Sequence, residues 1–123
     1  MLVVYASLTG NVEDFVNRLD AKVCHIDEYH KGLGKFVLVT YTTGRGLVPK
    51  EVTDFLKLNA ENMVGVVGSG NRIWGLDFAR SADTISHEHD VPVLLKIQLR
   101  GTDKDRETLI ERMNNLAELH RAK

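Results

Sequence analysis

Short apolar runs alternate with longer amphipathic segments along the whole chain, and this alternation restricts the possible folds more than any other feature of the sequence. The apolar runs occupy residues 2–6, 23–26, 36–41, 63–67 and 91–99. They are short enough for strands and apolar on both faces, as expected where helices cover both sides of a parallel sheet. Five strands that alternate with helices predict an α/β domain with a parallel sheet.

Four segments between and after these runs carry apolar residues at three- and four-residue spacings, which is typical of one buried helix face. The residues expected to face inward are Val12, Phe15, Val16 and Leu19; Val52, Phe55 and Leu56; Phe78, Ala82 and Ile85; and Leu109, Ile110, Met113, Leu116 and Ala117. Pro49 suits the first turn of the second helix. Thr102 and Asp105 form a T-x-x-D capping box, which predicts that the last helix starts there.

The connection between the second and third predicted strands is unusually short. Only residues 27–35 separate these strands, whereas a crossover that contains a helix usually needs about a dozen residues or more. A segment of this length still reaches about 30 Å when it is extended. We therefore expect a loop in place of a crossover helix, and a shortened version of the fold.

The composition indicates one globular domain without a strong charge. The chain has 123 residues, 43% of them hydrophobic, and a formal net charge of −1. We therefore expect a single domain over residues 1–123 that has no nucleic acid or membrane as a partner. One cysteine excludes an internal disulfide. No run approaches the roughly 20 apolar residues of a membrane span. A signal peptide is not expected, because the apolar run at residues 2–6 is too short and has no basic region before it. The expected location is cytoplasmic.

Three loops rich in Ser, Thr, Asn and Gly follow the first, third and fourth predicted strands. They cover residues 7–11, 42–46 and 69–75. In an open parallel sheet the carboxyl ends of the strands meet at one edge, and ligands bind there. The three loops are therefore the candidate binding site.

The first of these loops leads directly into a predicted helix. The hydroxyl groups of Ser7 and Thr9, with the free N–H groups of residues 9–12, are suited to binding one anion such as phosphate. The alternative is that Ser7, Thr9 and Asn11 only cap the helix and turn the chain. The loop matches neither the Walker nor the Rossmann nucleotide-binding pattern.

The only tryptophan of the chain, Trp74, lies in the third loop. An indole in a polar, glycine-rich loop is suited to stacking on a planar heterocycle, while the loop amides bond the polar edge of that ring. The alternative is that Trp74 folds back over an edge of the core.

The chain offers no recognisable set of catalytic or metal-binding side chains. His87 and His89 are two residues apart near a helix end and point to different sides, so a metal pair is not expected. Cys24 is expected to be buried and inert. No carboxylate pair and no Ser/His/Asp set stands at the strand ends. If the protein performs chemistry, a cofactor would carry it.

The three loops together resemble those of the flavodoxin-like NrdI proteins. The shared motifs are S-x-T-G-N at residues 7–11, T-Y-T-T-G-x-G at 40–46 and S-G-N-R-x-W-G at 69–75. The resemblance runs from Met1 to the start of the last helix. It implies a flavodoxin-like three-layer sandwich with sheet order 2-1-3-4-5 and non-covalently bound FMN. The second and third motifs are the specific ones, since many flavodoxins share the first.

The resemblance also assigns the candidate FMN site. The phosphate would lie on residues 7–11, and the isoalloxazine ring would lie between residues 42–46 and 69–75 with Trp74 against it. The residues implied to contact FMN are Ser7, Leu8, Thr9, Gly10, Asn11, Val12, Thr42, Thr43, Gly44, Gly46, Ser69, Gly70, Asn71, Trp74 and Gly75.

The function that the resemblance implies is that of an accessory protein of class Ib ribonucleotide reductase. Its reduced FMN would react with oxygen, and the oxidant would reach the di-manganese site of the reductase small subunit and help to form the tyrosyl radical. A flavin reductant of unknown identity is a second implied partner. Arg45 lies between two glycines near the expected flavin edge. It is suited either to stabilising a reduced flavin or to facing solvent or a partner protein.

Three alternatives to this function stay open. A general flavodoxin-type electron carrier is expected to be strongly acidic, and a net charge of −1 lacks that bias. A flavin-free regulatory module is possible because fold does not fix function, but a phospho-receiver would need acidic residues where Tyr5, Ala6 and Ser7 stand. A quinone reductase would need a second substrate region.

Overall fold

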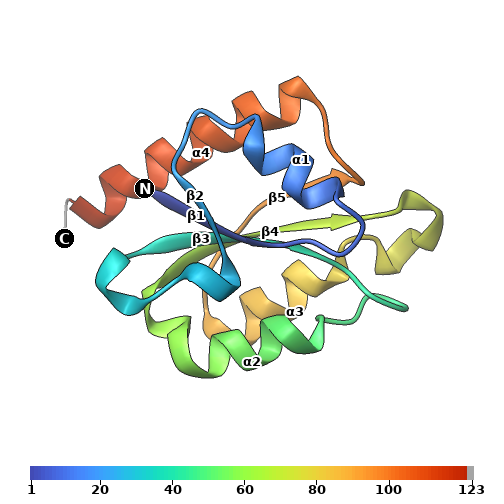
Figure 1. Cartoon of the computed structure of the whole chain (residues 1–123). Coiled ribbons are helices and arrows are strands. Elements are labelled where there is room, and N and C mark those ends of the chain that lie inside the picture. The colour runs from blue at the N-terminus through green and yellow to red at the C-terminus, as the bar shows by residue number, and fades with distance from the viewer. Residues whose placement is uncertain (122–123) are drawn as a thin grey trace.

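A computed structural model describes residues 1–121 and shows one five-stranded parallel sheet between two layers of helices (Figure 1). The strands are β1 (Leu2–Ala6), β2 (Val23–His25), β3 (Phe36–Tyr41), β4 (Met63–Gly70) and β5 (Val93–Gln98). The α-helices are α1 (Asn11–Asn17), α2 (Lys50–Asn59), α3 (Arg80–His89) and α4 (Asp103–Arg121). The sheet order is β2-β1-β3-β4-β5. The predicted α/β sandwich and its strand order 2-1-3-4-5 are confirmed.

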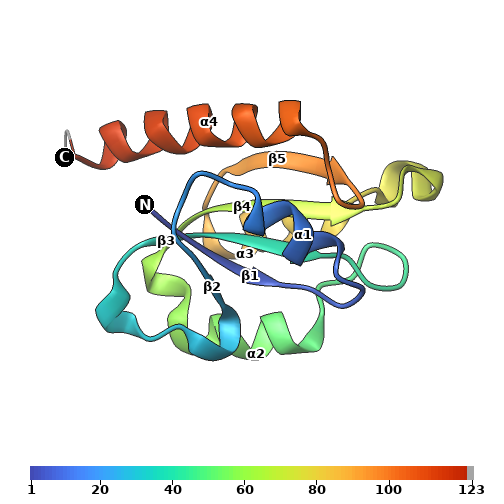
Figure 2. The same ribbon diagram turned by 45° about the horizontal axis from the view of Figure 1, so that its top comes forward.

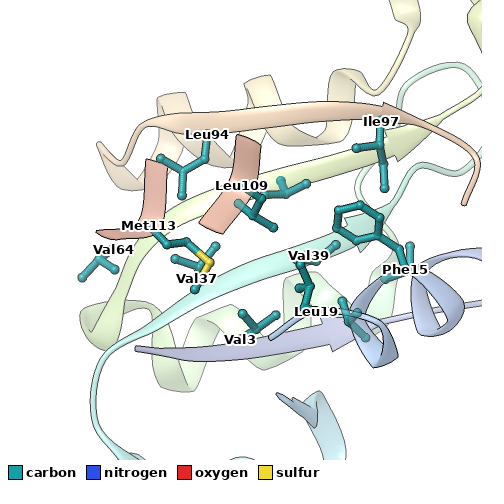
Figure 3. Packing of buried hydrophobic residues seen from close by; sticks show 13 residues of the cluster. Val3, Phe15, Leu19, Val37, Val39, Val64, Leu94, Ile97, Leu109 and Met113 are labelled. Atoms are coloured by element: carbon teal, nitrogen blue, oxygen red, sulfur yellow. The ribbon is translucent and has the colours of Figure 1, made fainter. Parts of the chain in front are cut away.

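Helices α1 and α4 cover one face of the sheet, and α2 and α3 cover the other (Figures 1 and 2). On the first face Phe15 and Leu109 have no exposed surface and pack with Val39 and Ile97 of the strands (Figure 3). The second face has its own cluster, to which α2 and α3 contribute buried residues. Because both faces are covered, the central strands are apolar throughout.

The start of α4 is fixed by the predicted capping box. The Thr102 N–H donates to Asp105 Oδ2 at 2.9 Å, and the Asp105 N–H donates to Thr102 Oγ1 at 3.1 Å. Each side chain thereby satisfies a backbone donor that has no partner inside the helix.

The short connection between β2 and β3 contains no α-helix, as predicted, but it is more ordered than a plain loop. It consists of two 3-10 turns, η1 (Ile26–Glu28) and η2 (Lys31–Leu33). The Tyr29 hydroxyl donates to the Gly34 carbonyl at 2.6 Å and accepts from Asn62 Nδ2 at 3.0 Å. The predicted strand at residues 23–26 was one residue too long, because Ile26 begins η1.

Two other predicted boundaries were wrong. Strand β4 continues to Gly70, beyond the predicted end at Val67, since Gly68 and Ser69 stay paired with both β3 and β5, and Gly70 stays paired with β5. Strand β5 lies within the run 91–99, as predicted. Phe78 lies before α3 and ends a 3-10 segment, η4 (Arg72–Asp77), so it does not belong to the buried face of that helix.

Helix α1 ends at Asn17, one turn earlier than the apolar spacing suggests. Leu19 lies beyond the helix end and is still buried in the core. In α4 the predicted inward residues are graded, with Leu109 and Met113 buried and Ile110, Leu116 and Ala117 partly exposed. No helix within residues 1–121 is both long and apolar enough to cross a membrane.

Candidate functional site

A pocket lies at the carboxyl edge of the sheet, between the loops that follow β1, β3 and β4. These loops lie at the same end of the molecule in both views (Figures 1 and 2). The predicted residues that line the pocket are Ser7, Leu8, Thr9, Asn11, Val12, Thr42, Gly44, Ser69, Gly70, Asn71 and Trp74. The structure therefore brings the three predicted loops together around one space.

Four of the predicted residues do not line the pocket. Gly10 forms the N-cap of α1, and Gly75 is a kink between two 3-10 turns with φ 56°. Thr43 pairs with Leu47 in a short hairpin, and Gly46 is buried against α3. Each of these residues shapes a loop, and none contributes to the pocket wall.

The pocket also has lining residues that the sequence did not reveal: Tyr41, Asp77, Ala79 and Leu99. Tyr41 lies inside the second motif, so that motif carried a signal for it. Leu99 directly follows β5 and thus lies at the carboxyl end of a strand, where ligands bind in parallel sheets, so this rule could have predicted it. Asp77 and Ala79 had no such signal, because the sequence did not show that the chain folds back after Gly75.

Ser7 has a hydroxyl group that the protein itself leaves without a partner. Its Oγ is the only buried side-chain oxygen or nitrogen in residues 1–121 that makes no hydrogen bond. Helix α1 is capped by the left-handed Gly10 with φ 88°, and no side chain accepts a capping hydrogen bond. The alternative that Ser7, Thr9 or Asn11 caps this helix is therefore wrong. A buried unpaired hydroxyl is costly, which fits a ligand that completes it.

The loop after β3 forms a tight hairpin beside the pocket. The N–H of Thr43 donates to the Leu47 carbonyl at 3.0 Å, and the N–H of Leu47 donates back at 2.8 Å. Thr42 Oγ1 lies 2.7 Å from Ser81 Oγ, which is fully buried at the start of α3. This contact anchors the hairpin to α3. Arg45, at the hairpin tip, is exposed and does not line the pocket.

The segment after β4 is tied to the end of β5. The Ser69 hydroxyl donates to the Leu99 carbonyl, and the Arg72 N–H donates to Gln98 Oε1 at 2.7 Å. Trp74, within η4, keeps 45% of its surface exposed and lines the pocket. The alternative that Trp74 covers an edge of the core is therefore wrong, and one wall of the pocket presents an aromatic ring.

The pocket is almost free of charge. Of the described residues that line it, Asp77 is the only one with a charged side chain. Tyr41 donates its hydroxyl to Glu51 Oε1 at 2.8 Å, and burial together with this hydrogen bond raises the pKa of Tyr41 to about 12. Tyr41 is therefore neutral at physiological pH, and the wall offers mainly neutral hydroxyl and amide groups to a ligand.

The described residues contain no group of three or more His, Cys, Asp and Glu side chains able to hold a metal ion. Cys24 is half-buried rather than fully buried as predicted. The pKa of the Cys24 thiol is raised mainly by burial and to a lesser extent by the nearby Glu28 carboxylate. A raised pKa lowers the reactivity of the thiol.

The sequence matches the family described as NrdI Flavodoxin like over residues 3–111. It is 42% identical over 124 residues to the protein called Protein NrdI from Bacillus licheniformis, covering 98% of this chain and 93% of that protein. Both matches include all three pocket loops.

Two solved flavodoxin structures share this architecture. A short-chain flavodoxin associated with a non-canonical PDU bacterial microcompartment is 25% identical, with a TM-score of 0.69 and 96% of each chain covered. A Fusobacterium nucleatum flavodoxin bound to flavin mononucleotide is 18% identical, with a TM-score of 0.54, over 98% of this chain and 96% of that one. The second likeness shows the fold alone. The family match and the identity to the Bacillus protein together establish that this chain belongs to the NrdI flavodoxin-like family.

Proposed function

We propose that this protein binds FMN without a covalent bond in the pocket at the carboxyl edge of the sheet. The observation that carries the proposal is the buried, unpartnered Ser7 hydroxyl in a pocket lined by neutral donors. Membership of the NrdI family supports it, and the Fusobacterium flavodoxin of the same fold is bound to flavin mononucleotide. Flavin phosphate is an acceptor for hydroxyl and backbone N–H donors of this kind.

In this proposal each loop has a separate part in binding. Ser7, Thr9 and the backbone N–H groups of Asn11 and Val12 hold the phosphate, since these four residues line the pocket where β1 leads into α1. The ring lies between the 42–46 hairpin and the 69–75 segment, where Trp74 provides a flat apolar surface. The anchoring contacts of Thr42 and Ser69 keep both walls in place before FMN arrives.

The bound flavin would supply the redox chemistry: once reduced, it would react with oxygen to provide the oxidant that assembles the di-manganese tyrosyl-radical cofactor of class Ib ribonucleotide reductase. The residues of this chain bind and orient the flavin and exclude water from one side of it. The cytoplasm is the proposed compartment.

Four exposed apolar side chains lie on the loops that form the pocket, and they suit a protein partner. They are Leu8 after β1, Leu47 at the end of the 43–47 hairpin, and Ile73 and Leu76 within η4, and they are 69%, 62%, 81% and 100% exposed. Exposed apolar groups gathered at one place are typical of surfaces that bind other proteins. We propose that the reductase small subunit docks here, so that the oxidant has a short path to it.

The test of this function compares two reactions of the FMN-loaded, reduced protein. In the first it is mixed with manganese-loaded small subunit and oxygen, and tyrosyl radical is followed by electron paramagnetic resonance. In the second it donates electrons to cytochrome c. We expect radical formation that depends on this protein. Efficient electron donation without any radical would instead indicate a general electron carrier.

Replacing Ser7 by Ala should have opposite effects on the empty and the loaded protein. Without flavin the substitution removes an unsatisfied buried group, so the free energy of unfolding should be unchanged or higher by about 1 kcal/mol. FMN should bind roughly tenfold or more weakly, because a hydrogen bond to a charged group is worth about 1.5–3 kcal/mol. Denaturant unfolding of the apoprotein and FMN titration measure the two effects.

The matched control is Ser86→Ala, whose hydroxyl donates to the Val91 carbonyl away from the pocket. It should lower the free energy of unfolding and leave FMN affinity unchanged. If Ser7→Ala behaves in the same way as this control, Ser7 has no part in binding the phosphate.

A further inference from the structure

Asp77 stands out in the pocket because it is the one charged side chain among the described lining residues. Its side chain keeps 27% of its surface exposed, so the carboxylate is partly withdrawn from water. The proposed ligand carries a phosphate and becomes more negative when its ring is fully reduced. A free carboxylate in the wall would oppose that form of the ligand.

Arg80, in the first turn of α3, compensates this charge. Its Nη1 lies 3.0 Å from Asp77 Oδ1 and donates a hydrogen bond to it. Arg80 itself does not line the pocket, and 59% of its side chain is exposed. The pair therefore combines a charge in the pocket lining with a counter-charge on a residue outside that lining.

The path of the Arg80 side chain depends on Gly46. A Cβ atom at Gly46 would lie 2.8 Å from Arg80 Cβ and 3.0 Å from Arg80 Cδ. Gly46 also has φ +83°, a conformation that residues with a Cβ rarely adopt. The glycine thus leaves room for the arginine stem to pack against the hairpin while its guanidinium binds Asp77. Arg80 contacts both loops that flank the proposed ring site, the hairpin at Gly46 and the η4 segment at Asp77.

We propose that Arg80 is a positioning residue that, by holding the Asp77 carboxylate, sets how strongly the pocket prefers fully reduced, anionic FMN to oxidised FMN. This inference rests on the proposed FMN site. Oxidised flavin takes up two electrons and one proton to give that anion, with dithionite as the electron donor in the test. Because the pair is partly exposed, solvent and salt screen its effect, and we expect changes of about threefold to tenfold.

The experiment is a redox titration of the FMN-loaded protein at fixed pH and ionic strength, together with a measurement of the affinity for oxidised FMN. The two measurements give the preference of the pocket for reduced over oxidised FMN. Arg80→Ala should reduce the preference for the reduced flavin by about threefold to tenfold, where tenfold corresponds to about 30 mV for a two-electron couple. Asp77→Asn should change the preference in the opposite direction. Arg80→Lys should retain most of it, because the ammonium can still pair with the carboxylate.

The double variant separates positioning from a direct effect of the arginine charge. If Arg80 acts through Asp77, then Arg80→Ala has little effect in the Asp77→Asn background. The matched control is the exposed pair Lys31–Glu61 at 2.6 Å, whose segments precede β3 and β4 and thus lie at the other edge of the sheet. Lys31→Ala and Glu61→Gln should leave the preference unchanged.

The measured preferences for reduced FMN decide whether Arg80 acts through Asp77. If Arg80→Ala lowers the preference for reduced FMN equally in the parent and in the Asp77→Asn protein, Arg80 does not act through Asp77 and the positioning role is overturned. The role is also overturned if the Arg80→Ala and Asp77→Asn proteins both bind FMN and both keep the parent's preference. If the parent protein does not bind FMN, both this inference and the proposed function are wrong.

Discussion

Gly70→Ala is expected to damage the fold and the pocket together. A Cβ atom at Gly70 would lie 2.7 Å from the backbone N of Ala79 and 3.1 Å from its Cα. The obstacle is backbone, so the start of α3 would have to move away from β4. Overpacking of this kind costs about 1–3 kcal/mol, and we expect the upper half of that range.

The same displacement should reach the ligand. Ala79 lines the pocket and has a left-handed conformation with φ 49°, so it has little freedom to adjust. Its neighbours Asp77 and Ser81 hold the two loops beside the proposed ring site. We expect FMN affinity to fall by more than about tenfold, since roughly 1.4 kcal/mol of lost binding already corresponds to that factor. Denaturant unfolding and FMN titration provide the measurements.

Gly65→Ala is the matched control, because it makes the same change in the same strand on the other face. There the added Cβ would meet the ends of the Leu94 and Leu116 side chains, which can move. This variant should unfold within about 1 kcal/mol of the parent and bind FMN normally, since the loss of glycine flexibility offsets mild crowding. Equal damage from both substitutions would contradict the role assigned to the contact between Gly70 and Ala79.

Trp74→Ala is expected to weaken FMN binding by about tenfold to a hundredfold, because stacking a planar base on an aromatic side chain is worth about 1–3 kcal/mol. The unfolding free energy of the apoprotein should change by less than about 0.5 kcal/mol, as is usual for exposed positions. Trp74 is 45% exposed and belongs to neither core cluster. Because the variant lacks the only tryptophan, binding must be followed by flavin emission.

Two further variants test the stacking explanation. Trp74→Phe retains an aromatic face and should bind FMN within a few-fold of the parent. Ile73→Ala removes the neighbouring side chain, which is 81% exposed and does not line the pocket, and should leave FMN affinity unchanged. Loss of affinity in Ile73→Ala equal to that in Trp74→Ala would indicate a general disturbance of the segment.

The sheet and the location of the site were predictable because they depend on strong, local patterns. Five apolar runs, each separated from the next by a helix or a short connection, left few alternatives to a parallel sheet. The Thr102 and Asp105 box acts within four residues, so it could be recognised without knowing the rest of the fold. The three polar loops were brought together by the rule that the carboxyl ends of parallel strands share an edge.

The errors concern features that depend on packing between distant segments. Gly68 and Gly70 lack strand propensity, yet β4 continues through them because they stay paired with the neighbouring strands. Glycine is needed at both positions because α3 approaches too closely for a side chain on that face. Asp77 reaches the pocket only because the chain kinks at Gly75 and turns back toward α3. Neither the close approach nor the turn can be seen in a one-dimensional pattern.

The central claim, that this chain binds FMN in the described pocket, is tested most directly by a visible absorption spectrum. The protein is recorded as purified, and again after incubation with FMN and desalting. We expect flavin bands that survive desalting at one flavin per chain, quenched Trp74 emission, and loss of both the bands and the quenching on Gly70→Ala. A colourless protein with unquenched tryptophan would contradict it and leave only the fold and the family assignment standing.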